Sequence, residues 1–234
     1  MRSIESIVKD IANIYQERGK DAEEYLGKAR KLEDKFGSGF AIVYFWFYSV
    51  PQRWSQVEPK IFELMRPTNS FDLNTVLQMR RENVTSALRP LIFYNEISLQ
   101  LRNFCRAIKY EYSSWDNFVR ELREDSIFSI FRKMRLYRNI RLTFKNLAAM
   151  KSFIGINDDI VIPDVHVASI LGMKKAELNK YRTQERLFNE LLIFSREITK
   201  ELKRKGFQRI TMIKWSLAIW FYKARMDAKR LLKY

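Results

Sequence analysis

Glycine is absent from the long stretch between Gly39 and Gly155, and the whole chain of 234 residues holds only seven glycines and five prolines. These two residue types are the strongest breakers of regular structure. Most windows between them repeat apolar residues at i, i+3 and i+4, which is the spacing of one helix face. Strand-like alternation is absent except for a short extended piece at 160–162. The sequence therefore predicts an all-α protein.

The apolar periodicity and the breakers together place the helices. Helices are expected to stop at Pro51, Pro67 and Pro90, because proline cannot continue a helix. Gly206 is expected to close a long helix near the end of the chain. The predicted helices span 4–18, 22–35, 40–49, 56–65, 71–87, 91–110, 115–123, 127–134, 141–154, 165–171, 182–205 and 210–232.

The charge balance is strongly basic. Lysine and arginine number 43 against 27 acidic residues, a formal net charge of +16. Hydrophobic residues make up 47% of the chain, enough for a folded core. The charge excess favours a polyanionic partner such as DNA or RNA, or an anionic membrane surface. The alternative is a solvated surface of the kind that thermophilic proteins carry, although such surfaces usually balance their signs.

Cysteine and histidine usage narrows the chemistry. The chain has one cysteine, Cys105, and one histidine, His166. No disulfide can form within the chain, so a reducing, cytoplasmic environment is expected. One Cys and one His cannot supply a Cys/His metal cluster. The N-terminal residues lack an apolar signal core, and the apolar run 40–50 is too short to span a bilayer, so no membrane association is expected.

A basic segment without acids runs from Ser126 to Asn157. Apolar residues mark one face on each side of a turn near 135–140, which is the pattern of a helix-hairpin-helix. Such hairpins hold the phosphate backbone without reading sequence. The alternative is a basic face that is merely solvated. The predicted DNA-binding residues are Arg132, Lys133, Arg135, Arg138 and Lys151; Arg141 and Lys145 lie in the same segment.

A second motif, Ile-Pro-Asp-Val-His-Val at 162–167, joins a lone carboxylate to the only histidine. Pro163 favours an extended entry, and Asp164 then stands at the N-cap of the next helix. Aspartate is a preferred N-cap, so capping alone could explain it. An aspartate can also cap a helix and face a cleft. His166 is two positions on and points away from Asp164 on a helix, which favours a structural role for it.

The two motifs together resemble the helix-hairpin-helix superfamily of DNA glycosylases, with archaeal 8-oxoguanine glycosylase/lyases the nearest likeness. In that family a hairpin, often with a lysine at the start of its second helix, precedes a catalytic aspartate by about twenty residues. Here Lys145 precedes Asp164 by 19 residues. The segments Gly-Ser-Gly-Phe-Ala at 37–41 and Ile-Lys-Trp-Ser-Leu-Ala-Ile-Trp at 213–220 add to the likeness.

The resemblance implies a two-lobed helical bundle with a cleft between the lobes. One lobe would span 37–125, and the other would combine 1–36 with 126–234 and contain the hairpin. The sequence departs from the family in one respect, because its hairpin lacks the usual Gly-x-Gly. Registering on the turn puts Arg141, or even Arg138, at the family's lysine position. An arginine cannot lose its proton, so that register implies a monofunctional enzyme.

The activity implied by the resemblance is base-excision repair. A monomeric, nucleoid-associated glycosylase would flip a damaged base, such as an oxidised purine, out of double-stranded DNA. Asp164 would stabilise the positive charge developing on the sugar. Lys145, if it meets C1′, would add lyase activity through a Schiff base. No cofactor or metal is required. The aromatic residues expected to form the base pocket are Trp54, Trp215 and Trp220.

Two alternatives from other classes remain open. The first is a non-catalytic nucleic-acid-binding protein with a degenerate form of the same fold, favoured by the missing glycines. The second is an unrelated helical interaction protein, whose last helix would present Trp215, Ile219, Trp220 and Met226 to a partner.

Overall fold

The computed structural model describes residues 2–49, 54–65, 72–78, 80–89, 91, 93–140, 142–225 and 231. These residues form helices and connections without a strand, which confirms the all-α prediction. The chain folds into two compact units. Unit 1 combines Met1–Arg30 with Ile156–Tyr234, and unit 2 is Lys31–Gly155.

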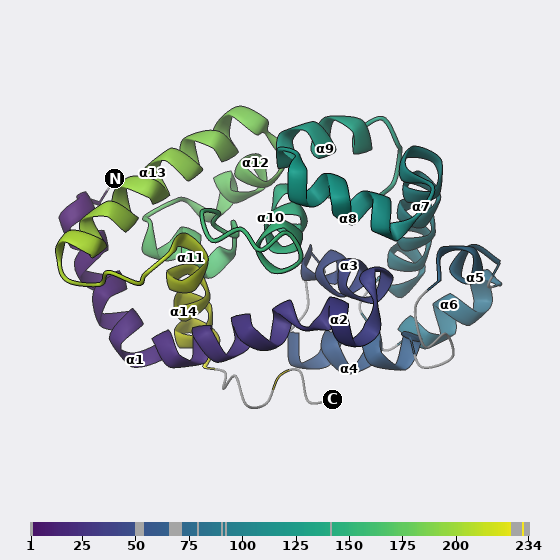
Figure 1. The fold of residues 1–234 in the computed structure, drawn as a ribbon, viewed down its shortest axis with the longest axis horizontal. Helices are drawn as coiled ribbons and strands as arrows, with labels where there is room; N and C mark the ends of the chain where they lie inside the picture. The colour runs from purple at the N-terminus through teal and green to yellow at the C-terminus, as the bar shows by residue number, and fades with distance from the viewer. Residues whose placement is uncertain are drawn as a thin grey trace. The chain divides into compact units, whose positions relative to one another are not determined.

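Unit 1 is built on its first and last helices. α1 lies alongside α14 and also packs on α11 and α13 (Figure 1). The ring of Tyr25 contacts the rings of Trp220 and Phe221, with centroids 6.0 and 5.6 Å away. The helices of this unit are α1 (Ile4–Arg30), α11 (Val165–Ile170), the 3-10 turn η3 (Lys175–Glu177), α12 (Leu178–Thr183), α13 (Glu185–Arg204) and α14 (Met212–Ala224).

α1 is longer than the sequence predicted. The separate helices expected at 4–18 and 22–35 are instead one helix, Ile4–Arg30, followed by the short α2. The helix continues through Gly19 because the ring of Tyr15 lies over it, and a Cβ at Gly19 would come within 3.1 Å of that ring. This packing compensates for the helix-breaking tendency of glycine. Gly172 and Gly206, in contrast, take positive φ just beyond helices that end within one residue of their predicted ends.

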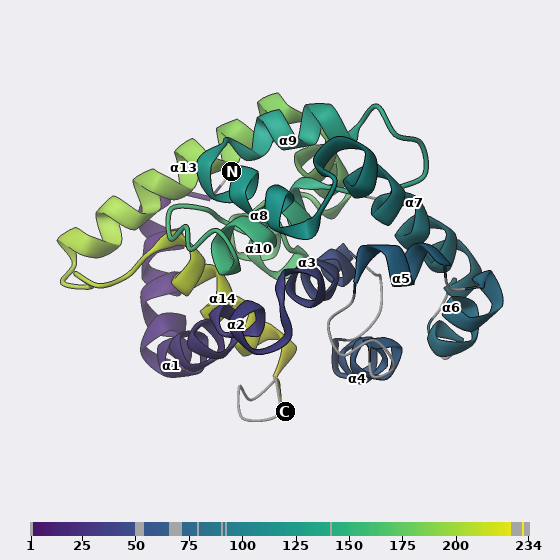
Figure 2. The same ribbon diagram turned by 45° about the vertical axis from the view of Figure 1, so that its right-hand side comes forward.

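Unit 2 is built around α3, which packs on α2, α4, α8 and α10 (Figure 2). Every residue from Gly39 to Trp46 is buried, as expected of a helix that is apolar on all sides. α7 packs on α5, α6 and α8. The helices are α2 (Leu32–Phe36), α3 (Ser38–Trp46), the 3-10 turn η1 (Phe47–Ser49), α4 (Trp54–Met65), α5 (Leu73–Gln78), α6 (Arg81–Leu88), α7 (Tyr94–Tyr112), α8 (Trp115–Glu124), α9 (Ile127–Met134) and α10 (Phe144–Phe153).

The division between the units differs from the predicted lobes. Residues 126–155 were expected to group with the chain ends, but they belong to unit 2. The reason is that α10 packs on α3 and α8. The ring of Phe153 stacks on that of Phe45 at 4.5 Å, and the indole of Trp46 donates a hydrogen bond to the carbonyl of Ile140. The basic segment is therefore held by the core of the middle of the chain.

Ile156, the first residue of the returning part of unit 1, is held in an unfavourable conformation. Its φ is +52°, in the left-handed region that a β-branched residue rarely adopts, and 62% of it is exposed. Its side chain therefore gains little burial to offset the strain.

Replacing Ile156 with asparagine should stabilise the protein by about 1 kcal/mol, because asparagine tolerates the left-handed region. The free energy of unfolding from denaturant titration measures this effect. Ile193→Asn is the matched control, since Ile193 is also exposed but lies within α13, where asparagine lowers helix propensity. A stabilisation by both variants, or by neither, would contradict the explanation.

Candidate nucleic-acid interface

The acid-free segment forms α9, the connection 135–143 and α10. The Ser126 side chain caps α9 by accepting a hydrogen bond from the backbone N–H of Phe128. The residues predicted to form the apolar face of α9 are all buried: Ile127, Ile130, Phe131 and Met134. The rings of Phe131 and Phe144 lie 4.1 Å apart and join α9 to α10. The basic side chains of this segment thus project from two helices that pack against each other.

α10 begins three residues later than predicted, at Phe144, because Thr143 caps it. The carboxamide oxygen of Asn146 accepts hydrogen bonds from the backbone N–H and the hydroxyl of Thr143, at 3.1 and 2.8 Å. The amide nitrogen of Asn146 donates to the carbonyl of Trp46 at 2.5 Å. The end of the connection is consequently tied both to α10 and to the last turn of α3.

Three arginines of the segment are exposed: Arg132, Arg135 and Arg138. The guanidinium of Arg135 lies 5.5 Å from the centre of the Phe131 ring, a cation–π contact that leaves its charge at the surface. Within the described residues, neither Arg135 nor Arg138 makes an ion pair. Lys145 is partly exposed in the first turn of α10, and Arg141 lies outside the described residues.

Two lysines that were predicted to bind DNA, Lys133 and Lys151, have partners within unit 2. The ammonium of Lys133 lies 2.6 Å from the carboxylate of Glu121, and this hydrogen bond is the main cause that raises the pKa of Lys133. Its Nζ also lies 5.8 Å from the centre of the Tyr112 ring.

Lys151 is buried at the C-terminal end of α8. Its ammonium donates to the carbonyls of Leu122, Arg123 and Asp125 at 2.5, 3.0 and 2.9 Å. Burial lowers the pKa of Lys151. A cation at this place satisfies carbonyls that have no partner within the helix and complements the helix dipole. The structure therefore gives Lys151 a structural role.

Asp164 belongs to unit 1 and caps α11. Its Oδ1 accepts a hydrogen bond from the backbone N–H of His166 at 2.8 Å, and the residue is 7% exposed. Arg182, which the sequence did not single out, donates from Nε to the carbonyl of Pro163 at 2.9 Å. Burial lowers the pKa of Arg182, and the negative charge of Asp164 opposes that shift. Asp164 is thus a fixed carboxylate close to the partly exposed guanidinium of Arg182, whereas Lys145 belongs to unit 2.

The predicted base-pocket tryptophans are placed differently from one another. Trp215 is fully buried, and its indole N–H donates to the hydroxyl of Thr199 at 2.9 Å. It is a core residue, and no face of its ring is open to a base. Trp220 is partly exposed and packs against Tyr25 and Phe221. Trp54 begins α4, and its side chain lies outside the described residues.

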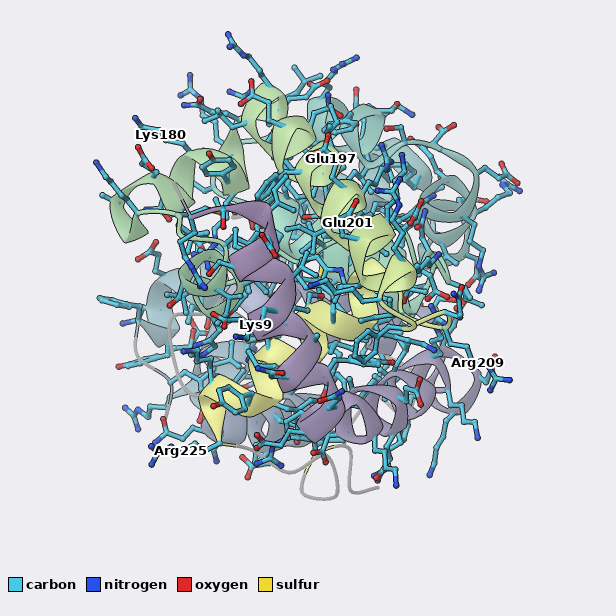
Figure 3. The ribbon with its side chains drawn as sticks, turned by 90° about the vertical axis from the view of Figure 1, so that its left-hand side faces the viewer. Lys9, Lys180, Glu197, Glu201, Arg209 and Arg225 are labelled. Carbon is cyan, nitrogen blue, oxygen red and sulfur yellow. The ribbon has the colours of Figure 1, made fainter. Side chains whose placement is uncertain are left out.

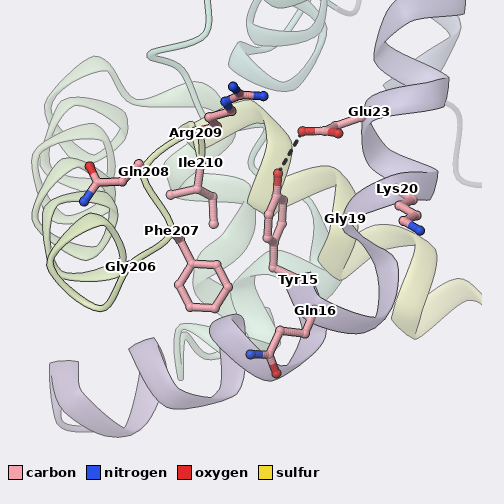
Figure 4. A pocket seen from close by; sticks show the side chains of 10 residues that line it. All are labelled: Tyr15, Gln16, Gly19, Lys20, Glu23, Gly206, Phe207, Gln208, Arg209 and Ile210. Atoms are coloured by element: carbon pink, nitrogen blue, oxygen red, sulfur yellow. Dashed lines mark hydrogen bonds between the residues drawn. The ribbon is translucent and has the colours of Figure 1, made fainter.

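A hollow of about 420 Å³ opens in unit 1 between α1 and the loop before α14 (Figure 4). The hydroxyl of Tyr15 donates to Glu23 at 3.2 Å, and the ammonium of Lys214 donates to the same oxygen at 3.0 Å. The Lys214 hydrogen bond is the main cause that lowers the pKa of Glu23, while burial raises that of Tyr15. Tyr15 and Glu23, which line the hollow, are thus hydrogen-bonded within one network with Lys214.

Charges of both signs share the surface of unit 1. Glu197 and Glu201 stand one turn apart on α13, on the same face of the molecule as Lys180 and Arg209 (Figure 3). This mixture contrasts with the acid-free α9–α10 segment. Among the described residues, no three His, Cys, Asp or Glu side chains gather in a way that could hold a metal ion. No helix there has both the length and the apolar character needed to cross a membrane.

Replacing Lys151 with methionine should destabilise the protein by about 2–3 kcal/mol, because one buried and two partly buried carbonyls lose a charged donor. Chemical denaturation followed by circular dichroism measures the change. Lys200→Met, at an exposed position of α13, is the matched control and should alter the free energy of unfolding by less than about 0.5 kcal/mol. A loss no larger than that of the control would show that Lys151 does not serve as the cap of α8.

Comparison with known proteins adds no relative: no protein-family model, no curated protein and no solved structure matches this chain.

Proposed function

We propose that the chain binds nucleic acid, with the α9–α10 segment contacting the phosphate backbone. The observation that carries this proposal is the exposure of Arg132, Arg135 and Arg138 on a segment without a single acid. The guanidinium groups of arginine match phosphate oxygens in a bidentate geometry. The net charge of +16 adds a long-range attraction for a polyanion.

The local backbone supports the same contact. Arg138 precedes Asn139, whose φ of +59° turns the chain sharply toward α10. α10 then begins at Phe144, and Lys145 lies in its first turn. A helix N-terminus carries a partial positive charge that favours phosphate. Because this connection has no glycine, the contact is made by side chains, and it is independent of base sequence.

A DNA glycosylase activity is the second candidate, and Asp164 favours it. A carboxylate that is 7% exposed and fixed by the His166 N–H has its orientation set before a substrate arrives. Such a group can stabilise positive charge on a deoxyribose as the glycosidic bond breaks. The negative charge of Asp164 acts to raise the pKa of the neighbouring Arg182, so the two groups lie close enough to attract each other. The same geometry also serves as a helix cap, so the two roles have to be separated by experiment.

The double variant Arg135→Gln, Arg138→Gln should weaken binding to duplex DNA of any sequence. The slope of log K against log salt should become shallower by about two, because two phosphate contacts are lost. Fluorescence anisotropy across a salt series measures both effects. Lys180→Gln with Arg196→Gln removes the same charge from exposed positions of unit 1 and is the control. Equal effects of the two double variants would contradict an interface at α9–α10.

Asp164→Asn separates catalysis from capping. Asparagine caps a helix as well as aspartate does, so the melting temperature should stay close to that of the wild type. Loss of the charge should lower base release from duplexes carrying 8-oxoguanine or uracil by about 100-fold or more. Alkaline cleavage after incubation reads out base release, and borohydride trapping of the wild type and Lys145→Ala tests for a lysine adduct.

The base-release activities of the wild type and of Asp164→Asn decide between catalysis and capping. Wild-type protein that releases no base from a full panel of lesions is not a glycosylase. A wild-type activity that survives in Asp164→Asn restricts Asp164 to its role as the cap of α11.

A further inference from the structure

Two large side chains stand out in solvent next to the basic segment. Tyr110, in the last turns of α7, is 81% exposed, and Leu136, in the connection after α9, is 80% exposed. Exposing an aromatic ring and a leucine to this degree forgoes the free energy that burial would contribute. Tyr137, the neighbour of Leu136, links the two elements.

The ring of Tyr110 has an ordered neighbour. The ring centroids of Tyr110 and Tyr137 lie 6.1 Å apart at an angle of 64°, an edge-to-face contact. The hydroxyl of Tyr137 donates to the carboxylate of Glu111, and its pKa is raised to about 12 by desolvation and by that hydrogen bond. The hydrogen bond to Glu111 thus holds the Tyr137 side chain. The pair holds one ring at a fixed angle beside the other.

A second contact joins α7 to the connection. The side-chain amide of Asn103 donates to the carbonyl of Asn139 at 3.5 Å. Arg106 donates to the side chain of Asn103 at 3.3 Å and is exposed one helical turn before Tyr110, so it shares a helix face with that ring. Arg135 and Arg138 flank Leu136 and Tyr137 along the connection. Exposed arginines thus lie on the helix face of Tyr110 and on either side of Leu136 and Tyr137 along the chain, while Glu111 is hydrogen-bonded to Tyr137.

We infer that Tyr110, with Leu136 and Tyr137, forms a stacking platform for an unpaired base of single-stranded nucleic acid. The inference rests on the proposed nucleic-acid binding and specifies its preferred ligand. An exposed aromatic ring offers a face to any base, whereas neighbouring arginines attract the phosphates on either side. Bases within a duplex are stacked on one another and present no face to the ring. The platform therefore selects unpaired nucleotides, and Arg106 and Arg138 supply the charge.

A protein partner is the competing occupant, since tyrosine and arginine are also common at protein interfaces. The charge favours nucleic acid. Arg106, Arg135 and Arg138 are all exposed here, and the segment of the two latter residues has no acid to pair with an incoming lysine or arginine. A polyanion with flat, apolar bases complements both properties of this surface.

The test compares the affinities of the full chain for a short labelled oligothymidylate and for a duplex of equal length, by fluorescence anisotropy. Tyr110→Ala should lower the affinity for the single strand about 5- to 150-fold, the range expected for loss of one stacked base. Its affinity for the duplex should stay within about twofold. Tyr110→Phe keeps the ring and should bind the single strand as the wild type does. Tyr222→Ala, at an exposed position of α14, should change neither affinity.

The outcomes distinguish the platform from the proposed function. If the wild type binds both ligands and Tyr110→Ala binds the single strand unchanged, the platform is wrong and nucleic-acid binding stands. If the wild type binds neither ligand at low salt, the proposed function fails and the platform fails with it. Equal losses of single-strand and duplex binding in Tyr110→Ala also overturn the platform, because a stacking residue discriminates between the two.

Discussion

The side chain of Asn146 provides hydrogen bonds that the buried core of unit 2 could not otherwise make. α3 is buried on all sides, so the carbonyls at its C-terminal end cannot turn to water. The amide of Asn146, itself fully buried, donates to the carbonyl of Trp46, while its oxygen accepts from Thr143. One side chain thus satisfies the end of α3 and the start of α10. The Trp46 indole fixes Ile140 in the same way. These buried hydrogen bonds anchor the basic connection, because breaking any of them would leave a buried polar group without a partner.

The sequence predicted the helices of the fold better than the residues at which they begin and end. Scarce glycine and helical periodicity correctly indicated an all-α chain, and the bounds of α9 agree with the predicted 127–134. The wrong boundaries have local causes. The predicted break between residues 18 and 22 contains Gly19, yet α1 is continuous there and the Tyr15 ring lies over Gly19. The periodicity of 141–154 extends a helix upstream of Thr143, where the cap formed with Asn146 ends it. Both boundaries depend on side-chain contacts that the apolar pattern of the sequence does not reveal.

The basic residues of the candidate site likewise could not be told apart from the sequence. Arg135, Arg138, Lys133 and Lys151 look equivalent in an acid-free segment. The structure separates them, because α8 brings the Glu121 carboxylate to Lys133 and its last carbonyls to Lys151. Similarly, Trp215 is fully buried, and its indole N–H is satisfied by Thr199 on another helix. Residue types and spacing identified where positive charge is concentrated. The packing of α8 gives Lys133 and Lys151 partners within the protein, which residue types and spacing do not reveal.

The absence of glycine from the connection bears on how a nucleic acid would be held. A Gly-x-Gly turn lets the backbone N–H groups come close to a phosphate, whereas this connection offers the long side chains of Arg135 and Arg138, of which only Arg135 is placed against a ring, that of Phe131. Contacts of that kind attract a strand without fixing its geometry. The rings of Tyr110 and Tyr137 differ, because Glu111 and the edge-to-face contact hold them in place. In the proposed function, selectivity for a strand's conformation therefore comes from the rings, and affinity comes from the arginines. A protein that works this way would favour distorted or unpaired DNA whether or not Asp164 performs chemistry on it.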